Sequence, residues 1–357
     1  MKFRGVKVFA LPGSDILAEK VCFHLNQTLP TAFKPEGGLR LTKPDIFTFD
    51  NENVMAQIDN VRGYFVVVIH TQCPPLHDRL FSLFALLDAI YNSNAADLLL
   101  SFAYMPYARS DRKDKPRISV MSKFLAEVLN NVLGVRRVML LDPHDSHVKH
   151  YFKPSADEIS SIYLYADFIN QLIATQFAGD MGRLLLAFSD ASAAKRFSKL
   201  TELLPFLQHD YIDKYRKDHK GTLELQKEIL CSGKICIMVD DEICSGGTAI
   251  GDAESLKRNG ADKIIMIAPH APLAKNGMTT EQIMASIEAS PIDQIIITDT
   301  IPAEEKIKLS SKFHVISIAK LMALAIQQTI LDESVTKLHE PSYAEQCRTG
   351  NYPVLNL

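Results

Sequence analysis

The sequence lacks an excess of basic residues. Its 39 lysines and arginines are outnumbered by 42 aspartates and glutamates, which gives a formal charge of −3 over 357 residues. A general binder of nucleic acid or of an anionic membrane surface would carry a basic excess. We therefore expect neither nucleic acid nor membrane as a partner, and any anion site must be local.

Paired cysteines and long apolar runs are also missing. The six cysteines are scattered, without a C-x-x-C pair or the spacing of a metal finger, which is typical of reduced cytosolic thiols. Nowhere do about 18 apolar residues run uninterrupted, and the first apolar stretch is too short for the hydrophobic region of a signal peptide. We expect a cytoplasmic protein.

Short apolar runs of strand length alternate with longer amphipathic stretches. The runs are residues 7–11, 64–70, 98–105, 137–142, 183–190, 234–241, 263–270 and 294–300. The amphipathic stretches between them include residues 78–95, 118–133 and 247–260. This alternation predicts an α/β fold with mainly parallel β-sheets flanked by helices on both faces.

The length and an internal echo both indicate two domains. A chain of 357 residues exceeds the usual size of one domain. GVRRVMLLDPH at 134–144 matches GADKIIMIAPH at 260–270, which suggests a duplicated α/β unit. We predict an amino-terminal domain at 1–155, a second domain at 156–332 and a tail at 333–357 that forms a surface arm or binds a partner.

The segment IMVDDEICSGGTA at residues 237–249 predicts a ligand site. Asp240 and Asp241 end an apolar run, at the place where open α/β sheets bind ligands. The backbone amides at the start of the next helix attract phosphate, and glycine lets the ligand approach closely. The loop residues concerned are Ser245, Gly246, Gly247 and Thr248. Paired carboxylates beside a phosphate loop suit a ribose phosphate, whereas an ordinary strand-loop-helix turn is the alternative interpretation.

The same segment resembles the signature of type I phosphoribosyltransferase folds, and residues 5–335 resemble the ribose-phosphate pyrophosphokinase family. The resemblance implies two tandem phosphoribosyltransferase-like domains. It implies transfer of the β,γ-diphosphate of ATP to O1 of ribose 5-phosphate, giving phosphoribosyl pyrophosphate and AMP. Mg²⁺ as cofactor and a homo-oligomer, dimer or hexamer, are further implications.

Two motifs resemble the ATP-binding segments of that family. SFAYMPYARSDRKDKPR at 101–117 is rich in cations that suit a polyphosphate, and it resembles P-Y-A-R-Q-D-[RK]-K-D with serine at the usual glutamine. FTFDNEN at 47–53 resembles a segment that reaches ATP from a neighbouring subunit. The residues implied in ATP binding are Arg109, Ser110, Arg112, Lys113, Phe49, Asp50, Asn51 and Glu52.

Two further motifs resemble metal-binding segments. LLDPHDSHVKHYF at 140–152 resembles M-D-L-H-[AS]-x-Q-I-x-G-F-F, which implies that His144 approaches the reacting phosphates and Mg²⁺, with Asp142 close behind. His147 stands at the usual glutamine and takes no role from the resemblance. LLLAFSDASAAKRF at 184–197 implies that Asp190 is a second Mg²⁺ ligand. Ser192 and Ala193 replace two glycines there, so a positive φ angle at these positions would be costly.

DYIDKYRKDHK at 210–220 resembles the flexible catalytic arm of the family, with the pattern K-x-R at Lys214 and Arg216. The resemblance makes these two residues catalytic together with His144. In a strand-like hairpin residues two apart share a face, so both cations can point at one phosphate. A charged, exposed hairpin is the alternative interpretation.

Cys244 stands where the family has a third aspartate, and it belongs to the implied ribose-phosphate loop. This departure, with those at Ser110 and at Ser192 and Ala193, keeps two other hypotheses open. One is the same transfer to an esterified ribose phosphate such as ADP-ribose, in NAD salvage. The other is a non-catalytic regulatory homologue of the synthetase, against which the retained His144, Asp190 and K-x-R residues argue.

Overall fold

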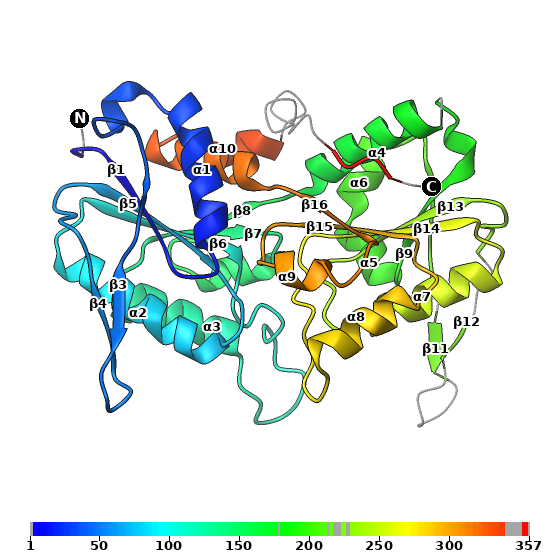
Figure 1. The fold of residues 1–357 in the computed structure, drawn as a ribbon, viewed down its shortest axis with the longest axis horizontal. Helices are drawn as coiled ribbons and strands as arrows, with labels where there is room; N and C mark the ends of the chain where they lie inside the picture. The colour runs from blue at the N-terminus through cyan, green and yellow to red at the C-terminus, as the bar shows by residue number, and fades with distance from the viewer. Residues whose placement is uncertain are drawn as a thin grey trace. The chain divides into compact units, whose positions relative to one another are not determined.

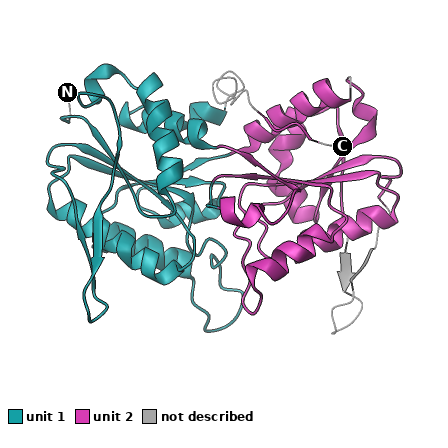
Figure 2. Cartoon of the chain, viewed as in Figure 1, with its two compact units in different colours: residues 1–160, 300–302, 318–347 teal, residues 161–299, 303–317, 348–357 magenta. Residues whose placement is uncertain are grey.

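The computed structural model describes residues 3–177, 179–212, 214–216, 223–225, 229–339 and 352–355, with backbone alone for 214–216 and 223–225. The chain forms two compact units, drawn in different colours in Figure 2. The first comprises residues 1–160, 300–302 and 318–347, and the second residues 161–299, 303–317 and 348–357. The domain limits expected at 155 and 332 stay a prediction.

The first unit is built on a six-stranded sheet in which every pair of neighbouring strands is parallel. Its order is β2 (Leu41–Thr42), β1 (Val6–Ala10), β5 (Phe65–Thr71), β6 (Asp97–Tyr104), β7 (Arg137–Leu141) and β8 (Asp157–Ile159). All of β5 is buried. Continuous apolar runs such as FVVVI form such strands because helices cover both faces of the sheet.

Helices cover the sheet of the first unit on both faces, as Figure 1 shows. On one face lie α1 (Asp15–Thr28) and α10 (Ala319–Ile330). On the other lie α2 (Leu76–Asn92) and α3 (Met121–Glu127). A π-helical turn, η2 (Val128–Val132), continues α3, and the antiparallel hairpin of β3 (Asp45–Thr48) and β4 (Val54–Gln57) stands apart from the sheet.

The core of the first unit follows the alternation of side chains along its strands. Val66 and Val68 of β5 join one buried cluster with Phe102 of β6 and with Leu83 and Leu87 of α2. Residues two apart on a strand share a face, and α2 presents residues four apart to it. Burying each of these side chains stabilises the fold by about 1.5–3 kcal/mol.

The second unit repeats this plan. Its parallel sheet has the order β10 (Gln208–Tyr211), β9 (Leu184–Phe188), β13 (Ile235–Val239), β14 (Lys263–Ala268), β15 (Gln294–Thr298) and β16 (Phe313–Ile316). Figure 1 shows α4 (Ile162–Gln176) and α6 (Ser198–Leu203) on one face, and α7 (Gly247–Arg258) and α8 (Thr280–Glu288) on the other. Short elements complete the unit: η4 (Met181–Arg183), α5 (Ala191–Arg196), α9 (Glu304–Ile307) and the antiparallel pair β11 (Lys214–Arg216) and β12 (Leu223–Leu225).

The predicted fold class is confirmed, and each of the eight apolar runs overlaps a strand. The two sheets have the same strand order. Counted along the chain, the second strand of each sheet lies at one edge, next to the first strand, and the third to sixth strands follow in order on the other side of the first. The match between residues 134–144 and 260–270, which suggested the duplication, does not join equivalent strands. It relates β7, the fifth strand of its sheet, to β14, the fourth strand of the other, so the repeated strand order is the sound evidence for the duplication.

The strand order also places one crevice in each sheet, between the carboxyl ends of the two strands where the order reverses. In the second unit these strands are β9 and β13, which lead into Asp190 and Asp240. In the first unit they are β1 and β5, where the amide of Thr71 donates to Oγ of Ser14 at 3.0 Å. The predicted ribose-phosphate residues therefore follow a strand at a switch point, and in the first unit the Ser14 side chain bonds to the end of β5.

The described parts of the tail pack on the chain itself. Val335 and Leu338 are buried in the short helix η5 (Val335–His339). The hydroxyl of Tyr352 donates to Oδ2 of Asp167 at 2.7 Å, and Nε2 of Gln176 donates to the carbonyl of Leu355 at 2.8 Å. Residues 340–351 of the predicted arm lie outside the described residues.

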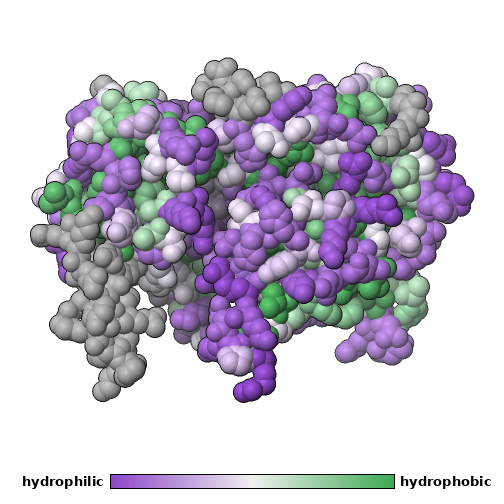
Figure 3. Space-filling view, turned by 180° about the vertical axis from the view of Figure 1, so that it is seen from behind, coloured by the Kyte–Doolittle hydropathy of each residue, from purple (hydrophilic) through white to green (hydrophobic). Residues whose placement is uncertain are grey.

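Among the described residues no helix is both long and apolar enough to cross a membrane. On the face drawn in Figure 3 hydrophilic residues predominate and the hydrophobic ones are scattered between them. The amphipathic helices thus turn their apolar sides to the two cores.

Candidate active site

The loop after β13 has the geometry of an anion site. Gly246 precedes α7 with a φ of 75°, in the left-handed region, and a Cβ atom there would lie 3.1 Å from Cγ1 of Ile287. Only glycine adopts this turn without strain. Within the described part of the chain no side chain caps the first turn of α7, so its amides and the positive end of the helix dipole can hold an anion.

The two predicted aspartates open the same loop, directly after β13. Oδ1 of Asp240 accepts from the amide of Asp241 at 2.9 Å, and Oδ1 of Asp241 pairs with Nη1 of Arg196 at 2.7 Å. Burial, and then the charge of Asp241, raise the pKa of Asp240 to about 7. Near neutral pH the pair therefore exchanges a proton easily, and its oxygens can accept hydrogen bonds from sugar hydroxyls.

Cys244 lies beside the carboxylate of Glu242. Its thiol donates to Oε1 of Glu242 at 3.2 Å. The replacement of the third aspartate by Cys244 thus does not remove all negative charge from this loop. Glu242 received no role from the sequence, although its position two residues before Cys244 is the signal that would have found it.

Asp190 follows β9, the strand next to β13. Its Oδ1 accepts from the amide of Ala193 at 2.7 Å and so caps the short helix α5. Ser192 and Ala193 lie inside that helix, and neither has a positive φ angle. The cost that a positive φ would carry at these positions does not arise, because the segment that is glycine-rich in the family pattern is helical here.

The predicted ATP loop of the first unit follows β6. Oγ of Ser110 accepts from the amide of Met121 at 3.4 Å, and its carbonyl accepts from the hydroxyl of Ser122 at 2.8 Å. Ser110 thus anchors the start of α3. Nη2 of Arg112 pairs with Oδ2 of Asp145 at 3.0 Å, which ties this loop to the one after β7. Arg109 and Lys113 are exposed.

The loop after β7 carries a strained aspartate. Asp142 has a φ of 39°, and its Oδ1 accepts from the hydroxyl of Ser160 at 2.7 Å. A non-glycine residue with positive φ is uncommon, and such strain is concentrated at functional sites. His144 lies two residues further on and is half-buried.

The two remaining groups of predicted residues belong to hairpins. Phe49, Asp50, Asn51 and Glu52 are exposed at the tip of the β3–β4 hairpin, where the rings of Phe49 and Phe47 lie 5.4 Å apart. Lys214 and Arg216 stand at the two ends of β11, opposite Leu225 and Leu223 of β12. The predicted hairpin is thus present in the backbone, and the side chains of the predicted catalytic arm lie outside the described residues.

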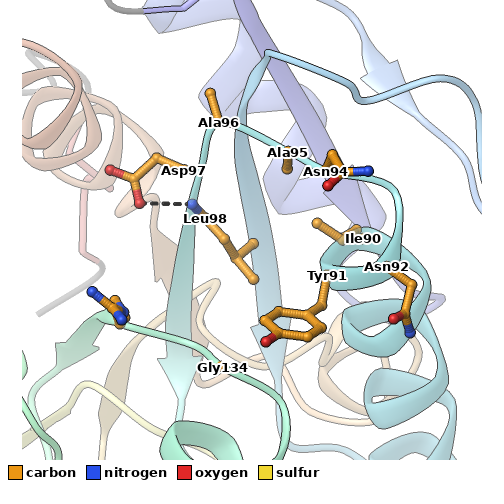
Figure 4. A pocket seen from close by; sticks show the side chains of 10 residues that line it. Ile90, Tyr91, Asn92, Asn94, Ala95, Ala96, Asp97, Leu98 and Gly134 are labelled. Carbon is orange, nitrogen blue, oxygen red and sulfur yellow. Dashed lines mark hydrogen bonds between the residues drawn. The ribbon is translucent and has the colours of Figure 1, made fainter.

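The described residues also line a hollow of about 500 Å³ at the other end of the first sheet, drawn in Figure 4. Asp97, at the start of β6, lies on its wall together with Tyr91, Asn94 and Gly134. The carboxylate of Asp97 is already bonded to the amide of Leu98 and to Nε of Arg137. None of the predicted site residues lines this hollow, because they follow the carboxyl ends of the strands.

Two family models match the chain. The N-terminal domain of ribose phosphate pyrophosphokinase matches residues 6–132, and the phosphoribosyl synthetase-associated domain matches residues 208–340. The chain belongs to the ribose-phosphate pyrophosphokinase family. The resemblance found in the motifs is thereby confirmed, and this is a family of enzymes.

Relatives and a solved structure agree with this membership. The ribose-phosphate pyrophosphokinase of Rhizobium meliloti is 28% identical over 337 residues, which cover 94% of this chain and 100% of that protein. The ribose-phosphate pyrophosphokinase of Aquifex aeolicus is 28% identical over 336 residues, covering 94% of this chain and 99% of its own. The crystal structure of phosphoribosylpyrophosphate synthetase from Mycobacterium smegmatis superposes with a TM-score of 0.78 at 22% identity, covering 92% of this chain and 99% of the other, and it shows the shared fold.

The Mg²⁺ ion implied by the family can be tested against the donor atoms. Asp190 uses Oδ1 to cap α5, and its second carboxylate oxygen takes no part in that cap. Oδ1 of Asp142 accepts a hydrogen bond from the hydroxyl of Ser160. Carboxylate oxygens are the protein ligands that Mg²⁺ prefers, so these two aspartates fit the ion.

Sequence reasoning missed Arg196 as part of the site. It stands six residues after Asp190, inside the same motif, and ends α5, where it pairs with Asp241. Arginine pairs readily with a carboxylate, but the chain positions alone do not tell which carboxylate it meets. The order of β9 and β13 in the sheet supplies that information.

Proposed function

We propose that the chain transfers the β,γ-diphosphate of ATP to the anomeric O1 of ribose 5-phosphate, giving phosphoribosyl pyrophosphate and AMP. Family membership supports the reaction class. The observation that supports this acceptor is the loop of the second unit, which runs from Asp240 and Asp241 at the end of β13 to the uncapped start of α7. Hydroxyls at one end and a phosphate at the other match these two features.

The acceptor binds through both parts of that loop. Asp240 and Asp241 accept hydrogen bonds from the ribose hydroxyls, and Arg196 keeps Asp241 in place. The 5-phosphate lies on the amides that open α7, helped by the hydroxyls of Ser245 and Thr248. Glycine at 246 and 247 allows the close approach.

ATP binds through cations and one exposed aromatic ring. Arg109, Arg112 and Lys113 hold the phosphates, and Ser110 fixes the loop to α3. Phe49, which is 49% exposed, stacks on the adenine, with Asp50, Asn51 and Glu52 completing the hairpin tip.

The transfer itself depends on positioning and charge. The anomeric hydroxyl attacks the β-phosphorus in line, and Lys214 and Arg216 stabilise the charge that develops on the transferred group. Closure of their hairpin excludes water, which protects ATP from hydrolysis. His144 lies near the reacting phosphates and orients them.

Asp142, His144 and Asp190 are the residues that would hold Mg²⁺. When bound, the ion neutralises phosphate charge and fixes the conformation of the triphosphate. The protein residues named above bind, orient and shield the substrates around it.

We further propose a cytoplasmic homo-oligomer, a dimer or a hexamer. None of the five cysteines that the structure describes forms a disulfide, which suits a reducing compartment. The exposed hairpin at Phe49 presents an aromatic ring to solvent, as expected of a segment that completes the site of a neighbouring subunit.

A second acceptor is favoured by one observation. Cys244 with Glu242 replaces the third aspartate beside the ribose, so the rim of the acceptor site differs chemically from the family pattern. An esterified ribose phosphate such as ADP-ribose, in NAD salvage, is the candidate.

One assay separates these candidates. The full chain is incubated with ATP, Mg²⁺ and either ribose 5-phosphate or ADP-ribose, and AMP and the mass of the sugar product are measured. We expect AMP and a sugar heavier by one diphosphate with ribose 5-phosphate. Product from ADP-ribose alone would establish the second acceptor, and no AMP with either would support the regulatory homologue.

A further inference from the structure

Three side chains without a role in the proposed reaction meet at one edge of the first sheet. Asp111 belongs to the loop after β6, and Asp145 and His147 flank the start of η3 (Ser146–Tyr151) after β7. One carboxylate oxygen of each aspartate and one ring nitrogen of His147 all lie within 4.8 Å of one another. The loops meet because β6 and β7 are neighbouring parallel strands.

The imidazole of His147 is held in a fixed orientation. Oδ1 of Asp145 lies 2.8 Å from its Nδ1 and also accepts from its backbone amide at 3.1 Å. When Nδ1 donates to this carboxylate, Nε2 presents its lone pair on the opposite side of the ring. Metal-binding histidines are commonly oriented by a carboxylate in this way.

Nε2 faces the buried carboxylate of Asp111, and the hydroxyl of Tyr151 at 3.3 Å and the backbone carbonyl of Asp111 at 3.4 Å lie next to it. The side chain of Asp111 is 3% exposed, and its Oδ2 has no hydrogen-bond partner within the part of the chain that the structure describes. This oxygen lies 3.6 Å from Nε2 of His147, which is too far for a hydrogen bond. A buried, unpaired carboxylate oxygen is costly, so the position favours a cation.

The separation of these two atoms fits a shared ion. Two ligands at about 2.1 Å from one metal, at an angle between tetrahedral and trigonal, lie roughly 3.4–3.6 Å apart. The carboxylate of Asp145 is the third donor within reach. Water can complete the coordination from the exposed side of Asp145.

The charge of the cluster also favours a divalent cation. Two carboxylates face one guanidinium, that of Arg112, which lies 3.0 Å from Oδ2 of Asp145 and 3.6 Å from Oδ1 of Asp111. The Arg112 side chain is 56% exposed and can therefore move toward solvent when an ion enters. A protonated His147 between the two carboxylates is the competing explanation of the same geometry.

We propose that Asp111, Asp145 and His147 form a second metal site, distinct from the Mg²⁺ residues, that binds a divalent transition-metal ion. One imidazole nitrogen with two carboxylates suits Zn²⁺, whereas Mg²⁺ prefers oxygen ligands alone. The sequence pattern at 140–152 lacks a zinc motif because one ligand, Asp111, comes from a different loop. The proposal does not depend on which sugar the enzyme uses.

Zinc binding to the full chain tests the site. The chelator-treated protein is dialysed against micromolar Zn²⁺ with excess Mg²⁺, and the zinc content is measured by mass spectrometry. We expect the wild type to hold one zinc ion per chain more than His147→Gln and more than Asp111→Asn. His150→Gln is the matched control, because His150 lies on the same η3 helix and bonds to Oγ of Ser155 outside the cluster.

Circular dichroism and the melting temperature show whether each variant is folded. If His147→Gln does not fold, the zinc content of Asp111→Asn tests the proposal. This variant should fold, since the amide of asparagine has nearly the same size as the carboxylate. Equal zinc content in the wild type and in a folded cluster variant would overturn the proposal and leave the protonated histidine as the explanation.

Discussion

At the scale of single residues, Asp240 is the most perturbed group of the ribose loop. Burial and the neighbouring Asp241 raise its pKa from 3.8 to about 7. Between these two pH values the folded chain holds a proton that the unfolded chain has lost. The contribution of Asp240 to the free energy of unfolding is therefore fully present below pH 4 and is lost as the pH rises toward 7.

Asp240→Asn removes this titration. We expect the melting temperature of the variant, relative to the wild type, to rise by a few degrees between pH 4 and pH 7 and then to level off. Differential scanning calorimetry over this range measures it. Asp59→Asn, at an exposed position of the other unit, serves as the control. If the melting temperature of Asp240→Asn, relative to the wild type, fell as the pH rises, the pH dependence of stability could not come from Asp240.

Gly246 is the second residue on which the site depends. Gly246→Ala places a side chain at a φ of 75° and 3.1 Å from Cγ1 of Ile287. We expect a loss of about 1–2 kcal/mol in unfolding free energy, from the left-handed backbone alone. Affinity for ribose 5-phosphate should fall as well, because the amides of α7 shift.

Gly251→Ala is the matched control in the same helix. A Cβ at Gly251 meets nothing within 4 Å, so the change should stabilise the protein by about 0.5–1 kcal/mol. Urea unfolding and titration calorimetry measure both variants. Equal stability of the two would show that the turn at Gly246 is not constrained.

At the scale of elements, the strands were the easiest part to predict. Runs such as YFVVVIH form strands because buried parallel strands are apolar on both faces. The helix expected at 118–133 begins only at Met121 and changes to a π-helical turn after Glu127. Periodicity does not reveal this change, since the π-helical turn is only five residues long.

Long-range packing was not predictable from local pattern. The helix α10 lies in the predicted second domain by sequence, yet it packs with α1 in the first unit, as Figures 1 and 2 show. Arg196 and Asp111 likewise take their importance from partners in segments that follow other strands. The motif residues were found because each motif is continuous in the chain.

The β11–β12 hairpin contains Lys214, whose replacement tests the proposed catalytic role of this hairpin. Lys214→Ala should lower kcat by about 10²–10³-fold, because its charge acts on the transition state, and should change KM for ribose 5-phosphate little. Lys308→Ala, an exposed lysine paired with Glu305, is the control. Steady-state kinetics measure both, and an unchanged kcat in Lys214→Ala would remove the hairpin from the mechanism.

At the scale of the whole molecule, the exposed hairpin at Phe49 predicts sites shared between subunits. The variants Phe49→Ala/Glu52→Ala and His144→Ala should each be inactive alone. When they are co-expressed in equal amounts, random assembly returns roughly one quarter of the sites to the native composition. If the co-expressed sample is no more active than the mean of the two variants measured alone, each active site is formed by a single chain.

The transfer of a diphosphate rather than a phosphate is the central claim for the molecule. The most direct test uses ATP labelled at the γ-phosphate, with Mg²⁺ and ribose 5-phosphate, followed by separation of the products. We expect the label in the sugar product, with one AMP formed for each labelled sugar. Label in free phosphate, or ADP in place of AMP, would contradict the account.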